Sequence, residues 1–97
     1  MMFKQEVIVR DYPYLKYFIE CYFNWSMDYV DLNQMAAEYL KIENEKHILP
    51  FKKEIEKLQT LSNSSEMVKE MVYKYGNRVL SLEKSKEMLN ILIRNFL

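Results

Sequence analysis

Apolar residues recur along most of the chain at spacings of three and four, the period of one face of an α-helix. The clearest stretch, residues 11–29, opens near a proline and ends in a polar and aromatic turn. Its apolar positions are Leu15, Phe18, Ile19, Tyr22 and Phe23. This spacing predicts a first helix over residues 13–24, with Asp11 as its N-cap. Pro13 would lie in the first turn, where its missing N–H has no helical partner.

A second helix is predicted over residues 31–42, because a capping signal precedes another apolar stripe. Asp31 would be the N-cap, and Gln34 would complete a capping box with it. Val30 and Met35 have the spacing of a hydrophobic staple around that cap. The expected buried face consists of Leu32, Met35, Ala36, Tyr39 and Leu40.

A third helix is expected over residues 46–61, with Asn44 as a candidate cap. Pro50 lies inside this stretch and removes one backbone donor, so the helix should either start near Leu49 or kink there. His47 stands alone at the start of the segment. An exposed or cap-forming role is expected for it, because no carboxylate and nucleophile accompany it in the pattern of a catalytic set.

Two further helices complete the pattern. The polar loop 62–65 precedes a helix expected over residues 65–75, and Gly76 just past its end is placed to adopt a left-handed C-terminal cap. The last helix is expected to run from residue 82 to the C-terminus, with Ser81 as N-cap. The apolar stripe of this last helix comprises Leu82, Leu89, Leu92, Ile93 and Phe96.

Length and composition fit this helical pattern. The chain has 97 residues, 49% of them hydrophobic, with one Gly and two Pro. That size supports one core, and so little Gly and Pro argues against a turn-rich β fold. We therefore predict an all-α fold, a compact single domain over residues 1–97 built as a bundle of about five helices. Residues 1–10 carry a short β-branched run and could form an extended N-terminal arm.

The chain offers little material for catalysis or metal binding. A single Gly excludes a glycine-rich phosphate loop, and one Cys with one His excludes an internal disulfide and a Cys/His metal site. Cys21 is expected to be a partly buried, inert thiol. No cofactor is expected, and the protein is predicted not to be an enzyme. No apolar run is long enough to span a membrane, so a cytoplasmic location is expected.

Charge is balanced overall but unevenly distributed. Lysine plus arginine and aspartate plus glutamate number 14 each, yet residues 20–45 contain six acids and one lysine, a net charge of −5. The acids are Glu20, Asp28, Asp31, Glu38, Glu43 and Glu45. This segment is either an ordinary solvated face or a surface for a basic partner.

A helix-turn-helix is one alternative, formed by the last two helices around Gly76. Glu83 and Glu87 would then face phosphates at the start of the recognition helix, which disfavours direct binding of nucleic acid. A helical regulator that binds DNA or RNA and an adaptor domain with an unrelated partner remain the alternative functions.

Short motifs distributed over most of the chain point to a family. The first helix and turn contribute Tyr12, Pro13, Leu15, Phe18, Tyr22, Phe23, Asp28 and Tyr29. Later positions are the capped helix 31–40, Glu54, Ile55, Leu58, Leu61, Gly76 and Leu97. In these features the chain resembles the small α-helical immunity proteins of bacterial contact-dependent growth inhibition, the CdiI type.

The resemblance implies a cytosolic protein that binds the C-terminal toxin domain delivered by sister cells, in a 1:1 complex, and blocks its active site. Such toxins are often nucleases, RNases in particular. A basic nuclease cleft would be complemented by acidic and aromatic side chains. The expected toxin-binding residues are Trp25, Asp28, Tyr29, Asp31, Glu38, Glu43 and Glu45. Packing in the core or within the turn is the alternative role for Trp25.

Overall fold

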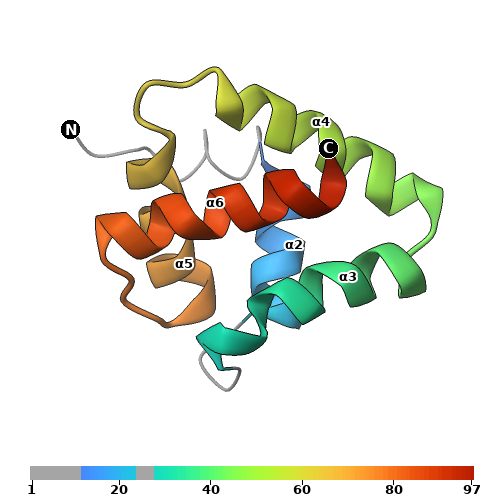
Figure 1. The fold of residues 1–97 in the computed structure, drawn as a ribbon, viewed down its shortest axis with the longest axis horizontal. Coiled ribbons are helices and arrows are strands. Elements are labelled where there is room, and N and C mark those ends of the chain that lie inside the picture. The colour runs from blue at the N-terminus through green and yellow to red at the C-terminus, as the bar shows by residue number, and fades with distance from the viewer. Residues whose placement is uncertain (1–11, 24–27) are drawn as a thin grey trace.

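Five α-helices and one short 3-10 helix form the described part of the chain, residues 12–23 and 28–97 of a computed structural model (Figure 1). The elements are α2 (Pro13–Tyr22), η1 (Tyr29–Asp31), α3 (Leu32–Ile42), α4 (Glu45–Gln59), α5 (Ser64–Gly76) and α6 (Leu82–Phe96). The predicted all-α fold of five helices is confirmed. The predicted arm over residues 1–10 and the predicted cap Asp11 lie outside the described residues.

Two of the helices, α2 and α6, organise the packing. α6 contacts α3, α4 and α5, and α2 contacts the same three helices. Figure 1 shows α6 lying across the middle of the molecule, with α4 on one side of it and α3 on the other. The first and last helices of the described chain therefore hold the other three in place.

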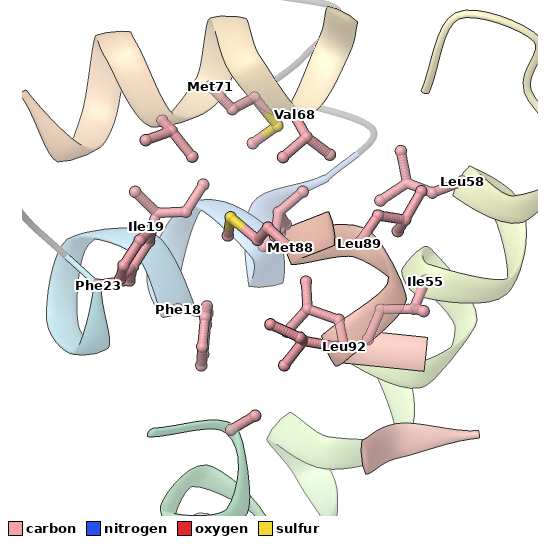
Figure 2. Packing of buried hydrophobic residues seen from close by; sticks show 14 of the residues in the cluster. Phe18, Ile19, Phe23, Ile55, Leu58, Val68, Met71, Met88, Leu89 and Leu92 are labelled. Carbon is pink, nitrogen blue, oxygen red and sulfur yellow. The ribbon is translucent and has the colours of Figure 1, made fainter. Parts of the chain in front are cut away.

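The core is built from the apolar stripes of all five helices. Ile19 of α2 points toward α5, which carries Met71, whereas Phe18 points away from α5, and Ile55 of α4 lies across the cluster beyond Met88 of α6 (Figure 2). The predicted stripes are largely confirmed. Most apolar residues at helical spacing are fully buried, including Leu15, Phe18, Ile19, Leu32, Ala36, Tyr39, Phe51, Ile55, Leu58, Met71, Val72 and Leu92. Among the predicted stripe residues that the structure describes, Leu82 alone is exposed, because it lies at the start of α6.

Aromatic rings close the end of the core where α3, α4 and α6 meet. The ring of Phe51 lies 4.8 Å from that of Phe96 and 5.1 Å from that of Tyr39, both measured between centroids. Their inclined geometries are those that aromatic pairs prefer. This cluster fixes the C-terminal end of α3 against the middle of α4.

Two of the predicted helix caps form side-chain hydrogen bonds in the structure. The side chain of Asn44 accepts a hydrogen bond from the Lys46 backbone N–H (3.0 Å), and Ser81 accepts one from the Lys84 N–H (3.1 Å). Each side chain satisfies an amide that has no partner within its helix. Asn44 and Ser81 are therefore confirmed as N-caps.

The predicted start of α3 is only partly right. Asp31 occupies the N-cap position, but its side chain makes no capping hydrogen bond. Gln34 donates instead to Glu38 (3.4 Å), and Val30 is 85% exposed. The capping box and the hydrophobic staple are therefore wrong. The reason is η1, which leads directly into α3 and holds Asp31 at φ −92° and ψ 3°, outside the extended conformation of a capping residue.

Pro50 does not determine where α4 begins. The helix runs unbroken from Glu45 to Gln59, so a start near Leu49 is wrong. Asn44 starts the helix one turn earlier, and Pro50 then deprives only the Lys46 carbonyl of its usual donor. Lys46 is exposed, so water can hydrate that carbonyl.

Gly76 has a different role from the one predicted. It is the last residue of α5 and has no positive φ; Asn77 adopts the left-handed conformation, at φ 51° and ψ 41°. A Cβ at Gly76 would lie 3.0 Å from Cγ2 of Ile19 and 3.2 Å from the carbonyl oxygen of Phe23. Glycine is therefore needed for the close approach of α5 to α2.

Candidate functional site

A groove of about 400 Å³ lies between α2 and α3. Its lining residues are Cys21 and Tyr22 from α2, Asp31 at the end of η1, and Gln34, Met35 and Glu38 from α3. Asp31, Met35 and Glu38 follow helical spacing and therefore share one face. The two acids are seven positions apart, which corresponds to about 10 Å along the helix axis. The groove thus has an acid toward each end and a thioether between them.

Four predicted contact residues direct their charge outward. Asp28, Asp31, Glu38 and Glu45 are exposed, and none of them forms an ion pair with another residue in the described segments. In the same region Lys16 is paired with Glu20 (3.1 Å). The surface formed by η1, α3 and the start of α4 therefore carries more acids than bases even with the exposed Lys41 of α3 counted, and its negative potential extends about 8 Å into solution at physiological ionic strength.

Glu43, by contrast, is turned into the fold. Its Oε2 accepts hydrogen bonds from the hydroxyls of Tyr17 (3.1 Å) and Tyr22 (2.5 Å), and its Oε1 lies 3.9 Å from Nδ1 of His47. Burial raises the pKa of Tyr22 above its ordinary value, and the hydrogen bond to Glu43 adds to the effect. Glu43 therefore ties the end of α3 to the side of α2.

Tyr29 is engaged in a similar way. Its hydroxyl donates to Oε1 of Glu87 (2.9 Å), it lies 3.2 Å from the carbonyl oxygen of Lys84, and the ammonium of Lys84 lies 4.3 Å from the ring centroid. Burial and the hydrogen bond to Glu87 raise the pKa of Tyr29. These contacts fasten η1 to α6, and they set the position of Asp28 and Asp31 on either side of Tyr29.

Glu54 has a role that sequence reasoning missed. It is only 6% exposed, and its two carboxylate oxygens accept hydrogen bonds from the backbone N–H groups of Tyr14 (3.0 Å) and Leu15 (2.8 Å). A side chain of α4 thus caps the N-terminus of α2. Burial raises the pKa of Glu54 to about 7, against the opposing effect of the two backbone hydrogen bonds. The available signal was its place in the apolar stripe between Phe51 and Leu58.

The single cysteine, Cys21, lines the groove, and the single histidine, His47, lies in the first turn of α4. Cys21 is exposed, contrary to the expectation of partial burial, because it lies on the open wall of the groove rather than against the core. Partial desolvation raises the pKa of its thiol, with Glu20 adding to the effect. His47 places Nδ1 3.3 Å from the capping oxygen of Asn44. Within the described residues no cluster of three or more His, Cys, Asp or Glu could hold a metal ion.

The structure therefore divides the seven predicted contact residues. Asp31 and Glu38 line one groove, whereas Asp28 and Glu45 are exposed outside it. The hydroxyl of Tyr29 and the carboxylate of Glu43 are bound internally. Trp25 lies outside the described residues.

The sequence model of the CdiI immunity protein family matches residues 11–92, which is most of the chain. This chain belongs to that family. It is thus an immunity protein of contact-dependent growth inhibition, whose partner is a cognate toxin. Searches of curated proteins and of solved structures found no match. None of the helices in the described segments has the length and hydropathy of a membrane span.

Proposed function

We propose that this immunity protein neutralises a nuclease toxin, an RNase in particular, by covering its active site with the acidic surface of η1 and α3. A nuclease binds a phosphate backbone and therefore carries basic side chains in its cleft. A negatively charged protein surface competes for the same groups. The proposed complex is 1:1 and forms in the cytoplasm of the toxin-producing cell.

One observation carries this proposal. Four carboxylates, those of Asp28, Asp31, Glu38 and Glu45, stand exposed without an ion-pair partner in the described structure. Uncompensated charge of one sign gives little to the stability of a fold, but it steers a partner of opposite charge and raises its association rate. A basic toxin cleft supplies the missing counter-charge.

The remaining predicted residues have supporting roles in this proposal. Glu43 and Tyr29 hold α3 and η1 in place through their internal hydrogen bonds, so the exposed acids are presented on a fixed frame. The half-exposed ring of Tyr29 and the indole of Trp25 would supply aromatic contact at the edge of the cleft. Pre-organisation of the surface reduces the entropy lost on binding.

Co-purification with the toxin domain tests the proposal. The chain is expressed together with its cognate toxin domain, and the complex is isolated through a tag on the toxin. A 1:1 complex that is inactive on RNA, with cleavage appearing once the immunity protein is removed, is the expected result. Absence of a complex, or a complex that still cleaves RNA, would contradict the proposal.

A further inference from the structure

We infer that the groove between α2 and α3 receives one arginine side chain of the toxin, which pairs with Glu38 while its stem lies against Met35 and Tyr22. This inference rests on the proposed function and adds to it a particular binding subsite. The acidic surface alone would attract any basic protein. The groove gives that surface a shape that selects one kind of side chain.

The walls of the groove are suited to an alkyl stem. Met35 is half-buried and its flexible thioether adapts to the shape of a neighbour. The ring of Tyr22 is stacked on Phe18 at 5.7 Å with an interplanar angle of 6°, and its hydroxyl is bound to Glu43. One wall is therefore rigid and the other adaptable, so little order has to be imposed when a side chain enters.

The polar groups are suited to a guanidinium. Gln34 donates to Oε1 of Glu38, which restrains the carboxylate at one end of the groove, and Asp31 adds a second negative charge toward the other end. A guanidinium is planar, has five N–H donors and forms bidentate pairs with a carboxylate. Arginine also carries a long apolar stem, which matches the mixed lining of this groove.

A second depression on the described surface is not suited to a cation in particular. It has a volume of about 380 Å³ and is lined by Glu70, Tyr73, Lys74, Asn77 and Val79. One acid and one base face each other there, so the site does not favour a cation over an anion. Another hollow, beside Leu82, is lined by Glu66, Glu83 and Lys86 and so carries one excess negative charge, whereas the groove between α2 and α3 carries two acids and no base.

Cys21 provides a direct probe of the groove, because it is exposed, lines the groove and is the only cysteine of the chain. The rate of its alkylation by a maleimide is measured by mass spectrometry, in the free protein and in the purified complex with the toxin domain. We expect the reaction to be at least about tenfold slower in the complex. As a control, Tyr73→Cys in a Cys21→Ser background places the thiol in the second depression, where the rate should not change.

Affinity measurements then test the pairing itself. Glu38→Gln and the groove-filling Met35→Trp should each weaken toxin binding about tenfold, whereas Glu56→Gln, a matched change at an exposed acid of α4, should not. Replacing each toxin arginine by alanine should identify one whose loss is not additive with Glu38→Gln.

The outcomes separate this inference from the proposed function. If a tight complex forms but Cys21 reacts at its free rate, the groove is unoccupied and the inference is overturned while the function stands. Protection of Cys21 with unchanged affinity of Glu38→Gln, or additivity with every toxin arginine, would also overturn the pairing. If no complex forms, both fail.

Discussion

Two regions of this protein hold pairs of acidic residues that look alike in the sequence but have different surroundings in the fold. At the groove, Asp31 and Glu38 face solvent without ion-pair partners in the described structure. At the junction of α2 with α3 and α4, Glu43 and Glu54 each accept two hydrogen bonds from distant residues. The first pair is available to a partner, whereas the second pair is already used by the fold.

This difference shows how function and stability are separated in a small helical domain. A carboxylate that accepts hydrogen bonds inside the fold has lost its water and found replacements, so its removal leaves buried donors without partners. An exposed carboxylate keeps its hydrating water until a partner binds. Substitutions in the two regions should therefore affect different measurements.

The largest effect is expected at Glu54. Glu54→Ala removes the acceptor of two backbone N–H groups and leaves a void, so the free energy of unfolding should fall by about 2 to 4 kcal/mol. Urea unfolding followed by circular dichroism measures it. Toxin affinity of the folded fraction should stay unchanged, and a stability like that of the wild type would show that the cap contributes nothing.

Glu43→Gln should have the next largest effect. The neutral amide accepts more weakly from the hydroxyls of Tyr17 and Tyr22 than the carboxylate does, so a loss of about 1 to 2 kcal/mol in the free energy of unfolding is expected. The same substitution at Glu38 should cost no more than about 0.5 kcal/mol. Equal losses at the two positions would remove the distinction between the regions.

The pH dependence of stability should report on the buried carboxyl of Glu54. Because burial raises the pKa of Glu54 from 4.5 to about 7, the folded protein holds a proton that the unfolded chain has released between these pH values. The contribution of Glu54 to stability should therefore fall as the pH rises from about 4.5 to 7 and stay constant above. The slope should not exceed about 1.4 kcal/mol per pH unit.

The difference in unfolding free energy between the wild type and Glu54→Gln, measured at several pH values, isolates this contribution. A difference that is flat from pH 4.5 to 7, or that grows in favour of the wild type, would contradict the assignment.

The smallest effect concerns the rate of association. Glu38→Gln should slow binding to the toxin by a few fold at low ionic strength, and the difference should shrink as salt screens the surface charge. Stopped-flow fluorescence at two salt concentrations measures it, with Glu56→Gln as the control. A salt-independent difference would mean that Glu38 acts by shape alone.

Local signals in the sequence predicted most of the fold. The apolar stripes located all five helices, and short-range caps such as Asn44 and Ser81 fixed two of their starts, because donor and acceptor lie within three residues of each other. The features that were missed depend on contacts between distant segments. Glu54 caps a helix some 40 residues away, and Gly76 is required by the approach of α2.

The candidate site, too, was predictable only where it depends on local sequence signals. The sequence identified an acidic segment, but it could not tell which acids were taken up by the fold. Glu43 is bound by Tyr17 and Tyr22, which lie 26 and 21 residues away, whereas Gln34, one turn earlier on its own helix, is the only hydrogen-bond partner of Glu38 within the described segments. The groove exists because α2 packs beside α3, and no short sequence motif predicts that packing.

The most direct test of the account is the affinity of the toxin domain for the double variant Asp31→Lys and Glu38→Lys, measured by isothermal titration calorimetry beside Glu56→Lys. We expect a loss of about 100-fold or more for the double variant, with an unfolding midpoint close to that of the wild type. The control should bind within about twofold of the wild type. Equal affinity for the wild type and the double variant would show that this acidic face is not the toxin-binding surface.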